Sequence, residues 1–351
     1  MPRAIVLICA LFSALLMMNV AFAQQNACTV DLPVGIIGAD GSLLHGLTAQ
    51  DITIHLRKQT LPVEKVDYDS GARRVLFILD TGRWLPPEAR KAETMLVDYI
   101  LGRARPGDTF ALLTTRGAVR KVSFDESREH LTKAVQELAV DPKEQDKAPN
   151  VLDTMMEGIQ WFGQPRPGDA ILIMADHLEG SISGTSPSTR YQPRTSGGTG
   201  PMQGVVQDSG RVMEPSSHAK FGTVMETLAD HGIRVFGLQL GGVNYTLTTV
   251  YEPGEENLFG ISLGSGGYAV LDGTDAYGSY VMTDARAQGL QHKAFQLYGA
   301  IAEFYLLRVN AAPPLRHESW KLELAKDLRK NTRALYPQWF DPCPSAESAS
   351  H

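Results

Sequence analysis

The stretch that decides the fold is VLFILDTG, residues 75–82. Its five consecutive apolar residues predict a strand that is buried on both faces of a parallel sheet. The strand ends at Asp80, and PPE at residues 86–88 then opens a helix with proline and an acid in its first turn. Open α/β sheets bind their ligands at the carboxyl ends of the strands. Asp80 is therefore predicted to lie at the binding edge of the molecule.

The composition is that of a globular protein with one large core and room for a smaller unit. The chain has 351 residues, of which 43% are hydrophobic, and its formal net charge is -6 at pH 7. A chain of this length can bury a large core. The acidic balance and the lack of a basic run argue against a nucleic-acid partner.

The first 23 residues have the pattern of an export signal. Arg3 supplies a positive charge, residues 5–18 form an apolar core, and AFA at residues 21–23 is a cleavage site with small residues. Cleavage there predicts a periplasmic or secreted protein without a membrane span. The alternative is an uncleaved anchor, because the apolar run of residues 4–23 is almost long enough to cross a bilayer.

Two cysteines remain once the signal is removed. Cys9 leaves with the signal, so Cys28 and Cys343 stand at opposite ends of the exported chain. Two thiols in an oxidising compartment predict a disulfide that joins these ends. Two unpaired, buried thiols are the alternative.

Apolar periodicity divides the exported chain into three parts. Residues 24–70 form a β segment, residues 71–312 alternate strands with helices, and residues 313–351 form a second β segment with a polar tail. Within the middle part, residues 118–124 follow a tight turn and predict an antiparallel edge strand. Residues 178–219 are rich in Ser, Thr, Gly and Pro, which predicts a mobile loop. The fold class is therefore α/β, a mostly parallel sheet with helices on both faces and a small β annexe from both chain ends.

This arrangement resembles von Willebrand factor A-like (VWA) domains, in the exported bacterial form that carries short β segments on either side. GLTAQDI at residues 46–52 is similar to the gLtaeDf motif that precedes the domain in that form. SGG at residues 265–267 resembles the TGG before its last sheet strand, and YLL at residues 305–307 stands where its returning strand begins. The resemblance covers most of the exported chain and implies a VWA-like fold.

The resemblance also implies a metal-ion-dependent adhesion site. In the family, D-x-S-x-S after the first strand, a threonine from a second loop and an aspartate after a later strand hold Mg²⁺ through oxygen atoms. Asp80 and Asp176 keep the two aspartates here, but Gly82 and Trp84 stand at the serine positions and Asn150 at the threonine position. Glycine has no side-chain oxygen, and tryptophan only donates hydrogen bonds. The site is therefore predicted to be degenerate and without a cofactor; a weak Ca²⁺ or Mg²⁺ site at Asp80, Asn150 and Asp176 is the alternative.

We expect the rim at the carboxyl ends of the strands to bind a protein partner, whose identity the sequence does not contain. Asp80 has a second interpretation, in which it accepts hydrogen bonds from the backbone of the turn that follows it. Trp84 either packs under the long loop or anchors a partner. The expected partner-binding rim consists of Asp80, Thr81, Gly82, Trp84, Asp176 and His177.

Two other functions stay open from the residues alone. The chain is a structural component of an envelope assembly if its β annexe, rather than the rim, makes the contacts. It is a serine hydrolase if GISLG at residues 260–264, which matches G-x-S-x-G, is a nucleophile motif with Ser262 at its centre. That motif needs a strand before it and a helix after it, whereas SGG at residues 265–267 breaks a helix. We therefore expect a binding protein rather than an enzyme.

Overall fold

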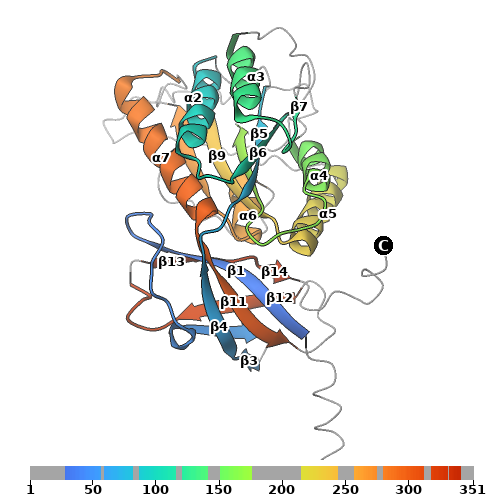
Figure 1. The fold of residues 1–351 in the computed structure, drawn as a ribbon, viewed down its shortest axis with the longest axis vertical. Coiled ribbons are helices and arrows are strands. Elements are labelled where there is room, and N and C mark those ends of the chain that lie inside the picture. The colour runs from blue at the N-terminus through green and yellow to red at the C-terminus, as the bar shows by residue number, and fades with distance from the viewer. Residues whose placement is uncertain are drawn as a thin grey trace, which may run out of the picture.

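The computed structural model describes ten stretches of the chain. These are residues 28–56, 59–81, 87–115, 121–140, 151–175, 215–243, 257–274, 280–311, 318–330 and 332–340. They form an α/β domain, in the upper part of Figure 1, and a β annexe, in the lower part. The expected signal, most of the expected loop, and Gly82, Trp84, Asn150, Asp176, His177 and Cys343 lie outside the described residues.

The α/β domain is built on a six-stranded sheet with the order β10-β9-β8-β5-β6-β7. All neighbours are parallel except β7, which runs antiparallel to β6 at one edge. The predicted fold class and its antiparallel edge strand are thus confirmed. The strands are β5 (Arg74–Leu79), β6 (Thr109–Thr114), β7 (Lys121–Val122), β8 (Ala170–Ala175), β9 (Arg234–Val243) and β10 (Ala269–Thr274).

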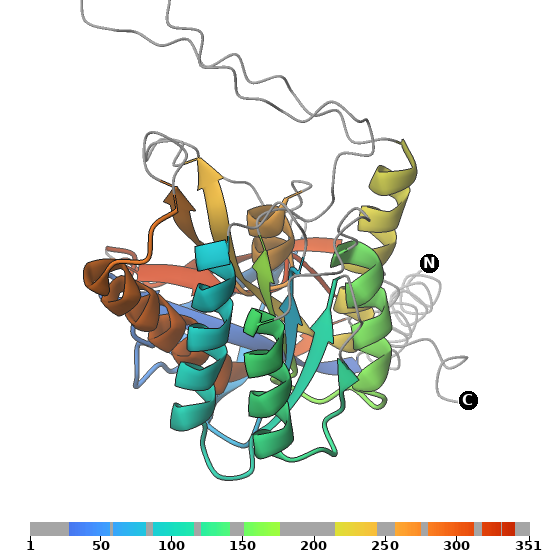
Figure 2. The ribbon, with the colours of Figure 1, turned by 90° about the horizontal axis from the view of Figure 1, so that it is seen from above.

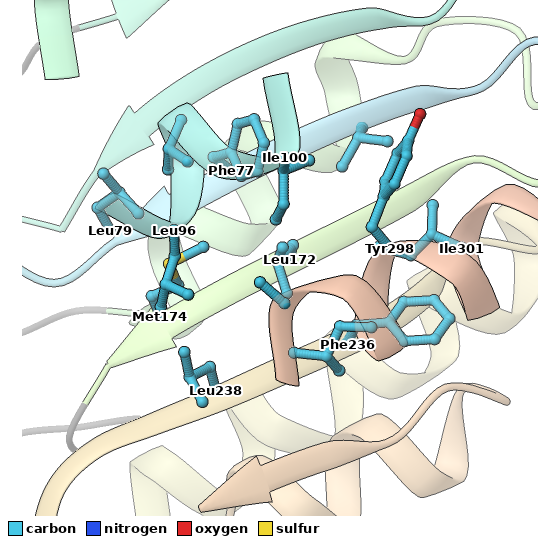
Figure 3. Close-up of a cluster of buried hydrophobic side chains, with 14 of the residues drawn as sticks. Phe77, Leu79, Leu96, Ile100, Leu172, Met174, Phe236, Leu238, Tyr298 and Ile301 are labelled. Atoms are coloured by element: carbon cyan, nitrogen blue, oxygen red, sulfur yellow. The ribbon is translucent and has the colours of Figure 1, made fainter. Parts of the chain in front are cut away.

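Helices cover both faces of this sheet (Figure 2). One face carries α2 (Pro87–Arg103), α3 (Arg128–Val140) and α7 (Asp284–Ala302), and the other α4 (Val151–Trp161), α5 (Pro215–His231) and α6 (Leu258–Gly264). Figure 3 shows side chains of α2 and α7 packed on β5, β8 and β9. The strand side chains alternate between the two cores, so Phe77 faces α2 and α7 while Ile78 faces the other helices.

Two helices differ from the sequence-based expectation. Helix α5 begins at Pro215, so residues 215–219 of the expected loop are helical. Helix α6 was not expected, because it has only seven residues and two of them are glycines. It ends where SGG was expected to break a helix, with Gly266 at a φ of 86°.

The annexe consists of two four-stranded antiparallel sheets that share one core. One has the order β13-β1-β11-β4 and the other β14-β12-β2-β3. The annexe is thus built from both chain ends, as expected, although β11 had been placed with the α/β part at residues 71–312. The strands are β1 (Cys28–Gly38), β2 (Ile52–Leu56), β3 (Gln59–Leu61), β4 (Val63–Asp69), β11 (Phe304–Ala311), β12 (Glu318–Leu324), β13 (Thr332–Leu335) and β14 (Trp339–Phe340). A single turn of 3-10 helix, η1 (Ala49–Asp51), precedes β2 and carries a capping box between Thr48 and Asp51.

Three arginines hold the end of α7 at the joint between the two units. The side chains of Arg73, Arg105 and Arg234 donate to the carbonyl groups of residues 300–302, at 2.8–3.2 Å. Arg73 and Arg234 each lie 4.3 Å from the ring centre of Phe304, the first residue of β11. Burial and the charge of Arg73 lower the pKa of Arg234 to about 9, so it stays a cation at neutral pH. Cations at a helix C-terminus stabilise its exposed carbonyls, and here they fix the path from α7 into the annexe.

Candidate functional site

The strand order identifies one place where a ligand crevice is expected. From β5 the chain continues to β6 on one side, and β8 then pairs with the other side of β5 and leads on to β9. The direction of winding therefore reverses between β5 and β8, and open α/β sheets bind ligands outside the carboxyl ends of strands at such a point. Asp80 follows β5 here, and its backbone N–H donates to the carbonyl of Met174 in β8 at 2.9 Å.

Asp80 ties three strand ends together and is itself almost completely covered. Its side chain is 2% exposed, and its Oδ1 accepts the hydroxyl of Thr115 at 2.9 Å. Thr115 follows β6, and its backbone N–H donates to the carbonyl of Leu79 at 3.0 Å. The carboxyl ends of β5, β6 and β8 are thus joined through Asp80. This resembles the second interpretation of Asp80, as an organiser of local structure, although its partners are a hydroxyl and the next strand.

A second carboxyl group, Glu93 of α2, lies beside Asp80. It is 4% exposed, and its Oε1 accepts the backbone N–H of Asp80 at 3.2 Å, alongside Met174. Burial, and then the charge of Asp80, raise the pKa of Glu93 well above its usual range, against smaller opposing effects of the hydrogen bond from the Asp80 backbone and of the charge of Arg90. Burial of an unpaired carboxylate is costly, so the neutral form is favoured. A buried acid that is favoured as neutral therefore supports the backbone of Asp80 beneath the rim.

A polar cluster extends the rim to the edge strand β10. Asp272 accepts the hydroxyl of Tyr280 at 2.8 Å and the ammonium of Lys293 at 2.7 Å, and Arg286 lies 3.6 Å away. Burial and the charge of Asp272 raise the pKa of Tyr280. Lys293 and Arg286 also donate to carbonyl groups of β10, at 2.9 Å each. These bonds attach α7 to the outer strand, so the rim side of the domain is fixed at this edge.

The described residues do not complete a metal site. Within the ten described stretches, no group of three or more His, Cys, Asp or Glu side chains could hold an ion. Next to Asp80 stand a hydroxyl that already donates to it and an acid that burial favours as neutral. Mg²⁺ prefers six oxygen ligands in near-ideal octahedral geometry. These donors do not fit that demand by themselves, and the remaining expected ligands, Asn150 and Asp176, lie outside the described part.

Ser262 does not stand where a nucleophile elbow would place it. It lies inside α6 rather than between a strand and a helix, and it is 0% exposed. Its hydroxyl has no hydrogen-bond partner among the residues that the structure describes. A base cannot activate a serine that it does not contact. The hydrolase motif at residues 260–264 therefore lacks its required geometry.

The sequence analysis missed Glu93 and Thr115, although each carries a recognisable signal. Glu93 lies four residues after Ala89 and three before Leu96, which puts an acid on the apolar face of α2. Thr115 follows a strand that neighbours β5, so its side chain meets Asp80 at the same edge of the sheet. An acid on an apolar helix face and a hydroxyl at a strand end are both detectable. Only the strand order shows that they meet.

The structure brings the two described chain ends to consecutive strands. Cys28 pairs with Ala311 at the end of β11, and Phe340 pairs with Glu318 at the start of β12. Residues 312–317 alone separate these two strands. Since Cys343 lies three residues after Phe340 and outside the described part, the disulfide with Cys28 stays a prediction.

Over the described ranges, no helix is both long enough and apolar enough to cross a membrane.

No family model matches the sequence, and no curated protein matches it. Among solved structures, the chain is similar to an aerotolerance-related membrane protein from Bacteroides fragilis, with 12% identity, a TM-score of 0.39 and coverage of 65% of this chain and 98% of that one. It is also similar to proximal thread matrix protein 1 from the mussel byssus, a structure with a zinc-occupied MIDAS motif, with 13% identity, a TM-score of 0.41 and coverage of 70% and 50%. It is also similar to a von Willebrand factor type A protein from Catenulispora acidiphila, with 11% identity, a TM-score of 0.37 and coverage of 77% of this chain and 49% of that one. This chain thus spans about half the length of the last two.

The expected VWA-like α/β arrangement is confirmed at the level of fold. The evidence is the strand order with its antiparallel edge and the helices on both faces of the sheet. The identities and TM-scores are low, so these likenesses carry no argument about partner, metal or activity.

Proposed function

We propose that this chain is an exported, non-catalytic protein-binding module that binds its partner at the rim of the α/β domain. The observation that carries the proposal is the meeting of three strand ends at the reversal point between β5 and β8. Asp80 and Thr115 hold this point together from below, and Thr81 follows at its surface, half-buried. A partner that reaches this point meets a preformed surface, and preorganisation reduces the entropy lost on binding.

Binding without turnover is supported by how the polar groups of the rim are used. Catalysis by a nucleophile needs a base in contact with it and donors that face the reacting atom. Among the described residues, Asp80 and Glu93 are the acids at this point of the rim; both are almost completely buried, and Glu93 accepts the backbone N–H of Asp80. Thr115 donates its hydroxyl proton to Asp80, and it is itself 8% exposed. These groups stabilise the site and do not present reactive atoms to a substrate.

The proposal includes recognition without a resident divalent cation. Gly82 and Trp84 contribute no hydroxyl at the family's serine positions. Asp80 is almost completely covered and accepts the hydroxyl of Thr115, and burial favours the neutral form of Glu93 beside it. Direct contacts between residues of the rim and the partner then supply the affinity. Export rests on the signal pattern of residues 1–23.

Capture from the envelope of the native organism tests the proposal. The exported chain would be immobilised, cross-linked to envelope extract, and its captured proteins compared with those of two variants. Thr81→Arg places a long, charged side chain at the rim, while Gln164→Arg places the same side chain at an exposed turn at the other end of the sheet. A central contact is worth about 2 kcal/mol or more in a protein interface, so Thr81→Arg should reduce capture of the specific partner at least about tenfold.

The matched variant decides the interpretation. Gln164→Arg should capture the partner as the unaltered chain does, and both variants should keep the same circular dichroism spectrum. Equal capture by all three proteins would show that the rim is not the binding face. A loss with Gln164→Arg alone would move the binding face to the opposite end of the sheet.

A further inference from the structure

A groove lies where the annexe meets the α/β domain, at the end of the sheet opposite to the rim. It encloses about 240 Å³. Four consecutive residues of β1, 30–33, form one side, and the last turns of α5 around Leu228 form another. The turn at residues 165–167 and Pro337 complete it. Its lining is mostly apolar, with Leu32 and Leu228 both almost fully buried beneath it.

The four consecutive residues of β1 in the lining indicate that the groove runs along the edge of this strand. Successive side chains of a strand point to opposite faces, so four consecutive residues can line one groove only if it runs along the edge of the strand. On its other side, β1 pairs with β11 from Cys28 to Val34. On the groove side, β13 pairs with β1 only from Gly35 to Gly38. Within the described part of the chain, residues 30–33 therefore have no strand partner on the groove side.

Local sequence explains why the ladder stops there. Pro33 has no N–H group, and a proline within a sheet is tolerated where its nitrogen faces an unpaired side. Beyond β13 the chain turns away at Pro337, which bridges to Ser265, and Gln338 donates to the carbonyl of Gly264 at 2.8 Å. These contacts hold the chain at the mouth of the groove. The groove thus continues the line of β13 along an open edge of β1.

We propose that an extended segment of a partner protein binds in this groove and adds a strand to β1, antiparallel to it and in line with β13. Two observations select this occupant. The groove is continuous with the existing β13–β1 ladder, so a strand that continues β13 would meet the backbone groups of residues 30–32 and the carbonyl of Pro33, which has no N–H to offer. The tail that follows Phe340, DPCPSAESASH, contains no Leu, Ile, Val, Met or Phe to fill apolar walls, so it is a poor occupant.

Strand addition defines the chemistry of the partner. Main-chain hydrogen bonds supply affinity, and the side chains on one face of the added strand enter pockets. Here that face meets Leu228 and the prolines of the groove, so it carries apolar side chains at alternate positions. The opposite face is free for polar residues. This site is independent of the proposed rim, because it lies at the other end of the sheet.

Peptide binding to the full exported chain tests the inference. The probe is a fluorescent peptide of alternating threonine and valine, about eight residues long, with lysine at each end to keep it soluble. Two further peptides carry N-methyl groups on alternate amides, one along each edge of the strand. Only one edge of an added strand faces β1, so one methylated peptide should lose at least about tenfold in affinity by fluorescence anisotropy, and the other should bind like the parent. No saturable binding of the parent at about 1 mM, or equal binding of all three peptides, would overturn the proposal.

Two variants of α5 provide the matched control. Ala229→Trp fills the groove from its helical wall, and Ala219→Trp adds the same side chain at an exposed position further along the same helix. Ala229→Trp should weaken parent-peptide binding at least about tenfold, and Ala219→Trp should leave it within about twofold. The rim variant Thr81→Arg should bind the peptide normally, which separates this site from the proposed function. Binding that survives Ala229→Trp, or that appears only after removal of residues 341–351, would show that the groove does not serve a partner strand.

Discussion

Replacement of Glu93 by glutamine probes the buried acid beneath the rim. Glutamine has nearly the same shape and keeps an oxygen that accepts the backbone N–H of Asp80, so the bond that Glu93 makes at 3.2 Å is preserved. It removes the ionisable proton, and with it the cost of a second negative charge beside Asp80. The variant therefore isolates the electrostatic role of Glu93 from its packing.

The expected effect depends on pH, and its sign follows from the raised pKa of Glu93. The folded protein keeps a proton that the unfolded chain releases above the ordinary pKa of 4.5. Wild-type stability is then lost as the pH rises from that value to the pKa in the folded state, at up to about 1.4 kcal/mol per pH unit. Glutamine has no such proton. Glu93→Gln should therefore equal the wild type near pH 4 and become more stable than it at neutral pH.

Unfolding by urea at a series of pH values between about 4 and 8 measures this difference. The control is Glu88→Gln, on the same helix, where the replaced acid is partly exposed and paired with Lys91 at 2.7 Å. An exposed pair of this kind contributes little, so its effect on the free energy of unfolding should stay below about 1 kcal/mol at every pH. A stability difference for Glu93→Gln that does not change with pH, or a variant less stable than the wild type at neutral pH, would refute the reasoning.

Three further predictions concern the joint, the chain ends and the rim. Arg234→Met should lower the free energy of unfolding by about 3 kcal/mol, because two charge-assisted hydrogen bonds to the end of α7 are lost. The relief of repulsion from Arg73 offsets part of this loss. Urea unfolding measures the change, and an unchanged midpoint would contradict the prediction. Reduction of the exported protein should raise its intact mass by two hydrogens if Cys28 and Cys343 are joined, and free-thiol labelling of both in the unreduced protein would exclude the bond. An ion that occupies a site in the folded state raises the melting temperature. Because the site is expected to be degenerate, millimolar Mg²⁺ should leave the melting temperature unchanged. A saturable rise that Asp80→Ala abolishes would show an ion site.

Much of the central sheet could be predicted because its signals are local. The run at residues 75–79 is apolar without interruption, as a strand covered on both faces must be, and the acid and prolines after it mark the end of the strand and the next helix. The same pattern recurs at residues 170–175. Helix α6 was not predicted, because seven residues with two glycines show no helical periodicity.

The rim was only partly predictable because its contacts join distant elements. Asp80 was identified from its place after a buried strand. Its contacts with Glu93 and Thr115 depend on how α2 packs on the sheet and on which strand neighbours β5, and neither is a property of a short window of sequence. The cluster around Asp272 likewise combines a strand with side chains of α7.

The annexe shows the same limit at a larger scale. The sequence indicated that residues 24–70 form a β segment and that both chain ends build the annexe. The register that pairs Cys28 with Ala311 and the early end of the β13 ladder at Gly35 follow from pairing across most of the chain. Such pairing has no local signal beyond Pro33, which marks an unpaired edge only once the strand is known.

Amide hydrogen exchange on the captured complex tests the central claim most directly. The exported chain would be labelled alone and with its purified partner, and protection compared along the chain. The account predicts new protection at residues 80–81 and 114–115, at the carboxyl ends of β5 and β6, with no change at the turn of residues 164–168 on the opposite end of the sheet. Protection confined to the annexe, with residues 80–81 exchanging as in the free chain, would contradict the assignment of the rim as the binding face.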